Sequence, residues 1–437
     1  MTNYKPEAPG DIQQERMALR GARCAIGPRE CPRVSIEVAG VHISRILTNP
    51  SYGHCSISDC SVIDLNGFLI LPGLINAHDH LEFALFPRLA NPPYRNYVEW
   101  GVDIHNTCSD VIATHRSVPK NLRVWWGGIR NLLCGATTVG HHNPFQSEFR
   151  RGDFPVKVIQ EYGWGHSLAL GSDLRAARWA TPETYPFIVH ACEGVDDQAR
   201  DELLELDRME VLDARTVLVH GLAIDRDGVT LMRERGASLI VCPSSNHFLF
   251  GRLPDISLLS EIENLTLGND SPLTAEGDLL DEIRFAIRSC KIPPQVAYHM
   301  VTEAPAAILR TREGEGFIRA SGIADLIAVR DTGDDASERL KTLSMVDIEF
   351  VMLGGQVQLA SEGVLERLPS EARKGLEPLS IDSTIRWLRA PVQELLRQTE
   401  DVLGQGQVRL GGKQVTIPLW TETEDVSQPE ECNLPLH

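Results

Sequence analysis

The sequence predicts an α/β protein in which a (β/α)8 TIM-like barrel carries a small β-sandwich domain. Two observations support this fold. Between residues 70 and 310, apolar runs of four to eight residues alternate with longer stretches of helical period. Because both faces of a buried parallel sheet are apolar, such runs indicate parallel strands. The chain has 437 residues, more than one ordinary core holds, which fits a barrel with appended segments.

Each expected barrel strand is a short apolar run, and several of these runs end at a polar residue. Seven runs are convincing, and a weaker one at residues 167–170 is the candidate for the eighth strand. Helix-like stretches separate them, as at residues 198–207 and 227–235. An open doubly wound sheet is the alternative, but no GxGxxG motif opens a strand-to-helix turn. The convincing runs occupy residues 69–77, 136–140, 156–159, 187–189, 216–219, 238–241 and 265–267.

The two flanks of the barrel are expected to join into one composite β-sandwich. Short alternating segments broken by Gly, Pro and Asn precede the barrel, and similar β-like segments follow it. The polar N-terminus reads as a loose arm, and the C-terminal extension contains a helix near residues 385–403. The expected boundaries are 1–20 for the arm, 21–68 and 313–364 for the two parts of the β-sandwich, 69–312 for the barrel and 365–437 for the C-terminal extension.

The composition limits the classes of partner and the compartment. The chain has 42 Lys and Arg against 60 Asp and Glu, a net charge of −18, which disfavours nucleic acid and anionic membrane surfaces. The N-terminus lacks the apolar core of a signal peptide, and no apolar run is long enough to cross a membrane. The ten cysteines form no CxxC pair. We expect a cytoplasmic enzyme with a small-molecule substrate, of a size compatible with a homo-oligomer.

The strongest local feature is Asn-Ala-His-Asp-His at residues 76–80, which closes an apolar run. Residues i and i+2 of a strand share a face, so His78 and His80 project together. At the C-terminal end of a barrel strand this face opens into the active site. The two imidazoles then form half of a metal site. A pair of surface histidines is the alternative.

Three later strand ends favour the metal site. His190 ends one apolar run and is followed by Glu193, His220 ends the next, and Asp270 follows the last. Polar residues at successive strand ends gather on one rim of a barrel. Three imidazoles and one carboxylate suit a single divalent metal, either Zn²⁺ or Fe²⁺. The expected metal ligands are His78, His80, His190 and Asp270.

The expected catalytic residues are Glu193, His220 and Asp270. A divalent metal lowers the pKa of its bound water toward neutrality and so generates hydroxide. Asp270 could bind the metal and also take the proton of this water. His220 would orient the hydroxide or polarise the electrophile, and Glu193 would carry the proton to the leaving group.

Four further residues are candidates for substrate contact, each against an alternative of simple packing. His142 lies at the end of the second apolar run, and Asn246 follows the run at residues 238–241. Tyr94 and Trp100 belong to a Pro- and aromatic-rich segment at residues 83–105, which could cap the pocket and stack on a planar ligand.

These motifs carry a resemblance to a known family. The stretch from Ile63 to His80 resembles the entry motif of the amidohydrolase superfamily, and a His with Glu at plus three, a later strand-end His and a Gly-x-Asp follow in the family's order. The segment Cys-Pro-Ser-Ser-Asn at residues 242–246 is similar to the deaminase and chlorohydrolase branch. The resemblance covers about residues 60–360. It implies a TIM-barrel metal hydrolase, usually mononuclear, whose relatives deaminate or dechlorinate heterocycles.

The sequence therefore predicts a metal-dependent hydrolase that uses metal-bound hydroxide on a C–N bond. Deamination of a small heterocycle is the first choice, and hydrolysis of an amide, a cyclic amide or a C–Cl bond on the same site is the alternative. A non-catalytic scaffold with an amidohydrolase-like fold is an alternative of another class. Such scaffolds typically lose metal ligands, whereas this sequence retains the expected set.

Overall fold

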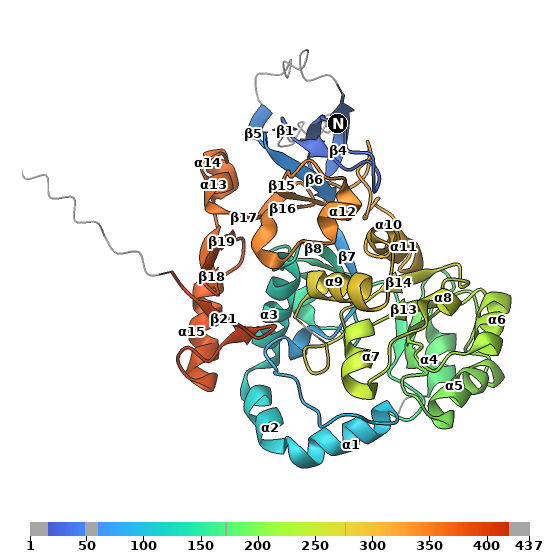
Figure 1. Ribbon diagram of the computed structural model, residues 1–437. Helices are drawn as coiled ribbons and strands as arrows, with labels where there is room; N and C mark the ends of the chain where they lie inside the picture. The colour runs from blue at the N-terminus through green and yellow to red at the C-terminus, as the bar shows by residue number, and fades with distance from the viewer. Residues whose placement is uncertain (1–15, 49–59, 171–172, 276, 419–437) are drawn as a thin grey trace, which may run out of the picture.

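The computed structural model describes residues 16–48, 60–170, 173–275 and 277–418. It confirms an α/β protein with parallel sheets. A three-stranded and a five-stranded parallel sheet are surrounded by helices, while two further sheets lie beside them, built mainly of antiparallel pairs. In Figure 1 the N-terminal strands β1, β4 and β5 lie at one end of the molecule, and helices α1 and α2 lie at the opposite end.

The two parallel sheets contain eight strands of the described chain, all buried or nearly so, which follow one another in sequence. The register runs evenly along the five-stranded sheet, for example from Val189 to Leu218 and from Ile240 to Thr266. The strands are β7 (Leu74–Asp79), β8 (Ala136–His141), β9 (Lys157–Val158), β10 (Gly163–Gly165), β11 (Phe187–Ala191), β12 (Thr216–His220), β13 (Ser238–Val241) and β14 (Leu265–Leu267).

Strand β14 approaches β7 closely, although it belongs to the other sheet. The backbone N–H of Asp270 donates to the carbonyl of His78 over 3.0 Å. Gly268 permits this approach, because a Cβ at that position would lie 2.6 Å from the Cβ of His78. The last parallel strand therefore delivers Asp270 next to the histidines that end the first.

Helices fill the connections after most of the parallel strands. Many begin with an aspartate whose side chain accepts backbone N–H groups; Asp196 and Asp225 do so for α5 and α6. The helices of this region are α1 (Tyr97–Thr107), α2 (Ser109–Ser117), α3 (Lys120–Leu133), α4 (Leu174–Ala180), α5 (Asp197–Arg208), α6 (Arg226–Arg235), α7 (Pro243–Phe250), α8 (Ile256–Leu259), α9 (Leu279–Ser289), α10 (Pro294–His299) and α11 (Glu303–Ile308), with short 3-10 turns η2 (Leu81–Phe83) and η3 (Ser147–Arg150).

Two strand predictions differ from the structure. The apolar run at residues 69–77 is two strands, β6 (Phe68–Pro72) and β7, which separate at Gly73 and join different sheets. Hydrophobicity alone could not separate them, because both are fully buried. The eighth strand is β10 at Gly163–Gly165, whereas residues 167–170 are turn. Strand β10 has only three residues and two glycines, so it carries no apolar run.

The remaining strands form a four-stranded sheet in the order β4-β3-β1-β5 and a nine-stranded sheet in the order β2-β6-β15-β16-β17-β19-β18-β21-β20. Both sequence flanks contribute to the larger sheet. The elements are β1 (Arg16–Arg20), β2 (Arg23–Cys24), β3 (Ser35–Ala39), β4 (His42–Leu47), β5 (Cys60–Asp64), β15 (Leu326–Arg330), α12 (Ala336–Leu340), η4 (Met345–Asp347), β16 (Ile348–Leu353), β17 (Gln356–Ala360), α13 (Glu362–Leu365), α14 (Ser370–Arg373), β18 (Glu377–Ile381), β19 (Thr384–Leu388), α15 (Val392–Leu403), β20 (Arg409–Leu410) and β21 (Lys413–Thr416).

The terminal segments differ from the secondary structure that the sequence predicts. Residues 1–15 of the expected arm lie outside the described residues, while Arg16–Arg20 forms the strand β1 between β3 and β5. In the C-terminal extension, β18, β19, β20 and β21 lengthen the nine-stranded sheet, and the predicted helix near 385–403 is β19 followed by α15. The indole of Trp126 on α3 donates to Thr399 on α15 over 2.8 Å, so the extension packs against helix α3. Among the described residues, no helix is long and apolar enough to cross a membrane.

Candidate active site

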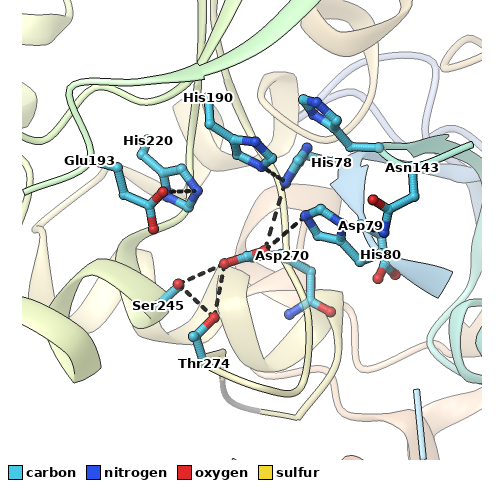
Figure 2. Close-up of polar contacts among 12 residues, drawn as sticks. His78, Asp79, His80, Asn143, His190, Glu193, His220, Ser245, Asp270 and Thr274 are labelled. Atoms are coloured by element: carbon cyan, nitrogen blue, oxygen red, sulfur yellow. Dashed lines mark hydrogen bonds and ion pairs between the residues drawn. The ribbon is translucent and has the colours of Figure 1, made fainter. Parts of the chain in front are cut away.

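The four predicted metal ligands come together at the carboxyl ends of the parallel strands (Figure 2). Nε2 of His78 lies 3.3 Å from Nε2 of His190. Oδ1 of Asp270 lies 3.7 Å from Nε2 of His78 and 3.6 Å from Nε2 of His80. Each of these side chains is at least nine-tenths buried. The convergence of three imidazole nitrogens and one carboxylate oxygen is the geometry of a metal site.

Contacts behind the histidines fix which nitrogen faces the centre. Nδ1 of His190 donates to the carbonyl oxygen of His166 over 2.9 Å, so its Nε2 carries a lone pair. The carboxamide nitrogen of Asn143 lies 3.0 Å from Nδ1 of His80 and donates to it, so this contact positions the ring but, unlike that of His190, does not place the ring proton on Nδ1. Burial, together with the neighbouring imidazoles, lowers the pKa of both His80 and His190 well below the usual range. Neutral imidazoles are the form that binds a metal.

A buried ion pair between Asp79 and Arg130 lies next to the two histidines that end strand β7. Asp79, between His78 and His80, is fully buried and accepts two hydrogen bonds of 2.7 Å from Arg130 on α3. Asn131 and Asn76 donate to the same carboxylate over 2.7 and 3.2 Å. This network anchors the backbone from which both imidazoles project.

Asp270 is held by two hydroxyl groups. Ser245 and Thr274 lie 2.7 and 2.9 Å from its Oδ2, so Oδ1 is the oxygen directed at the histidines. Burial by itself would raise the pKa of Asp270, but the hydrogen bond with His78 and the nearby imidazoles hold it well below the usual range. The carboxylate is therefore ionised and oriented toward the proposed ligands.

Glu193 and His220 form a second pair beside this centre (Figure 2). Nε2 of His220 lies 3.6 Å from the Glu193 carboxylate, and Nδ1 of His220 lies 3.0 Å from Oδ1 of Asn246. Burial raises the pKa of Glu193 well above its usual range, and the negative charge of Asp270 adds to this effect. Burial also lowers the pKa of His220 to about 4. Burial thus favours the protonated form of Glu193 and the neutral form of the adjacent His220.

Three residues of this site have left-handed backbone conformations. Cys192, His220 and Asp270 have φ values of 56°, 77° and 57°, although none is glycine. Such conformations cost roughly 1–3 kcal/mol each and persist where the surrounding structure determines them. They occur here where strands β11, β12 and β14 end, and they turn the chain so that the functional side chains meet.

Glu202 on helix α5 is hydrogen-bonded to the left-handed residue Cys192. Its carboxylate accepts a hydrogen bond of 2.8 Å from the backbone of Cys192 and one of 2.9 Å from the hydroxyl of Tyr97. Burial raises the pKa of Glu202 from 4.5 to about 7. The folded protein therefore binds this proton more tightly than the unfolded chain does between these pH values.

We expect this group to make the protein less stable as the pH rises from 4.5 to 7, because the stabilisation present below 4.5 is lost through the folded pKa. The loss is at most about 3 kcal/mol. Glu202→Gln should remove this part of the pH dependence in urea unfolding at pH 5 and pH 8. Glu205→Gln, exposed on the same helix, is the matched control. If the difference in unfolding free energy between pH 5 and pH 8 were the same in Glu202→Gln as in the wild type, Glu202 would titrate normally.

A cavity of about 200 Å³ opens onto the cluster. Trp100, a predicted substrate residue, lines it. Tyr94, His142 and Asn246 are not among the described lining residues. The hydroxyl of Tyr94 bonds Asp103 over 2.5 Å, while the buried His142 bonds the carbonyl of Gly165 and stacks on His190 with centroids 4.1 Å apart. These contacts favour packing and positioning for the three, and substrate contact by them stays a prediction.

The sequence interpretation did not single out His166, Asn143 or Arg130. His166 and Asn143 line the cavity, and Arg130 supports Asp79 from a helix. His166 lies just after the irregular strand β10, so no apolar run preceded it as a signal. Asn143, two residues after strand β8, had one available signal, namely its position after a strand end.

Comparisons with known proteins bear on the class of this protein. No protein-family model matches the chain. A 5-methylthioadenosine/S-adenosylhomocysteine deaminase from Haloquadratum walsbyi is 26% identical over 324 residues, which cover 61% of this chain and 72% of that protein. Another protein of that name, from Natronomonas pharaonis, is 25% identical and covers 68% of this chain and 82% of its own length.

Solved structures share the fold. A zinc-bound adenosine deaminase from Xanthomonas campestris superposes with a TM-score of 0.66 and 17% identity, over 79% of this chain and 93% of that one. A zinc complex of atrazine chlorohydrolase from Arthrobacter aurescens gives a TM-score of 0.67 and 16% identity, over 89% of this chain and all of that one. Together with the related sequences, these likenesses point to the amidohydrolase superfamily, whose deaminase and chlorohydrolase branch the chain resembles.

Proposed function

We propose that this protein is a metal-dependent hydrolase that deaminates a small heterocycle. The observation that carries the proposal is the placement of the Glu193 carboxyl group 3.6 Å from the imidazole of His220, beside a cluster of three histidines and Asp270. Burial favours the protonated form of Glu193 and the neutral form of His220. Deamination needs a proton donor for a ring nitrogen and an acceptor for a proton of water, and this pair offers both. The named deaminases among the relatives support the same reaction class.

The residues fit a single divalent metal. Nε2 of His190 carries a lone pair and lies 3.3 Å from Nε2 of His78, so both nitrogens could bind the same ion. With His80 and Asp270 they offer the donor set that suits Zn²⁺ or Fe²⁺. When bound, such a metal lowers the pKa of water and supplies a nucleophile at neutral pH.

His220, Glu193 and Asp270 would each carry out a different proton transfer. The Nδ1–H of His220 donates to Asn246, which leaves its Nε2 as an acceptor facing Glu193. Glu193 holds a proton that it can give to the heterocycle and then regain from water through His220 or Asp270. Asp270 has Oδ1 free for the metal or for a proton, because Ser245 and Thr274 occupy Oδ2.

The likeness to a chlorohydrolase supports a second candidate, hydrolysis of a C–Cl bond, and an amide or cyclic amide would suit the same groups. An amidohydrolase-like scaffold without activity is disfavoured, because the site keeps a full set of ligands and both proton-transfer groups.

Metal analysis and a substrate panel test the proposal. We expect purified protein to contain close to one equivalent of zinc or iron, and we expect ammonia to be released from at least one aminated heterocycle in a coupled assay. Removal of the metal by a chelator should abolish ammonia release, and added Zn²⁺ should restore it. A product heavier by one water without ammonia would favour the amide alternative. Protein that binds no transition metal would refute the catalytic assignment.

The proposed site also implies a particular assembly of the sheets. We propose that the two parallel sheets form one eight-stranded barrel that begins at β7, and that the other two sheets, built from both flanks of the chain and including β6, form a composite β-sandwich. The backbone bond between Asp270 and His78 supports closure, since it links the last strand to the first. The substrate would enter at the end where α1 and α2 lie (Figure 1).

A further inference from the structure

The outer wall of the active-site cavity is apolar. It is formed by η2, the segment after it, and helices α1 and α2. Four of its side chains are at least nine-tenths buried although they border the cavity, so they present fixed surfaces. The apolar wall consists of Phe83, Phe86, Leu89, Trp100, Ile104 and Ile112.

The polar atoms near this wall already have partners within the protein. The indole N–H of Trp100 donates to the carbonyl of Leu89 over 2.8 Å, and the hydroxyl of Tyr97 donates to Glu202 over 2.9 Å. The carboxylates among the described lining residues are Glu193 and Asp270, both in the catalytic cluster. The wall thus offers no carboxylate for the vicinal hydroxyls of a sugar, which acidic side chains commonly bind.

One cation borders the same cavity. Arg116, in the last turn of α2, is the single Arg or Lys among the described lining residues. It is exposed, and within the described part of the chain it makes no hydrogen bond or ion pair. A guanidinium group binds a carboxylate through two parallel hydrogen bonds. Its one positive charge neutralises the one negative charge of a carboxylate, but only half the charge of a phosphate dianion.

Resting on the proposed function, we propose that the substrate is an aminated heterocycle with an apolar arm that ends in a carboxylate, and that Arg116 binds this carboxylate. The ring would lie at the cluster of His78, His190 and Glu193, the arm against the apolar wall, and the acid at the cavity mouth. The S-adenosylhomocysteine in the names of the related deaminases also carries a carboxylate on an arm, and the proposed class differs from it by the absence of the sugar between ring and arm.

Matched compounds test the arm. Adenine alkylated at N9 with pentyl, carboxybutyl or phosphonobutyl is compared with adenosine, by ammonia release and by equilibrium binding to the zinc-loaded protein. We expect kcat/KM and affinity for the carboxybutyl compound to exceed those for the pentyl compound by at least about tenfold, which is about 1.4 kcal/mol. Adenosine should be the poorest of the four. In Arg116→Gln, the ratio of kcat/KM for the carboxybutyl compound to kcat/KM for the pentyl compound should fall to about one. In Arg116→Lys, part of this preference should remain.

Arg208→Gln, an exposed arginine on α5, is the control and should keep the ratio. A carboxybutyl compound that binds and reacts no better than the pentyl compound or adenosine would overturn the inference, as would a preference that survives in Arg116→Gln. Preference for the phosphonobutyl compound would overturn the carboxylate assignment. Arg116-dependent binding without ammonia from any compound would instead refute the proposed deamination and leave the inference standing.

Discussion

Glu193→Gln is expected to lower kcat for ammonia release by roughly a hundredfold to ten-thousandfold, the range of general acid–base catalysis. Glutamine keeps the size of the side chain and can still contact His220, which lies 3.6 Å from the carboxylate. It cannot deliver a proton to a ring nitrogen. The raised pKa of Glu193 has a further consequence, since wild-type activity should fall as the pH rises through that pKa and the acid loses its proton.

The control for Glu193→Gln is the same substitution at an exposed glutamate. Glu205→Gln changes an exposed glutamate on α5 and should leave kcat at the wild-type value. Metal content should be the same in all three proteins, because Glu193 is not among the clustered ligand atoms. If Glu193→Gln kept wild-type kcat with full metal content, Glu193 would have no part in the proton transfer.

Arg130→Met is expected to reduce the free energy of unfolding by about 3–5 kcal/mol, the usual cost of leaving a buried charge unpaired. Arg130 is 3% exposed and Asp79 is fully buried, so the carboxylate would lose its charged partner out of reach of bulk water. Because Asp79 lies between His78 and His80, zinc affinity should also fall by about tenfold to a hundredfold. Urea unfolding and competition with a zinc chelator measure the two effects.

The double variant Arg130→Met, Asp79→Asn separates charge from packing. It removes the buried charge while Asn131 and Asn76 still have a partner, so most of the lost stability should return. Arg397→Met breaks exposed pairs with Glu394 and Asp401 on α15 and should leave unfolding unchanged. A double variant no more stable than Arg130→Met would mean that the packing of Arg130, and not its charge, stabilises this region.

The candidate site could be predicted from the sequence because its residues follow apolar strands. His78, His190, His220 and Asp270 each stand at or just beyond the end of such a run, and parallel strands gather their carboxyl ends on one side. The supporting residues had no comparable signal. Arg130 lies within the regular helix α3, and nothing in its neighbourhood indicates that it reaches Asp79, 51 residues away in the chain. Strand β10 was missed because it is too short to form a pattern.

The sequence by itself therefore determined the α/β class, the resemblance to the superfamily and the order of the candidate site motifs, because alternation and motif spacing are local properties. Only the tertiary structure decided where the run at 69–77 divides, which sheet the C-terminal strands lengthen and which nitrogen of His190 faces the centre. It also decided that the pKa of Glu193 is raised, since that depends on burial and on the charge of Asp270. Such properties arise from contacts between distant residues, and no local pattern contains them.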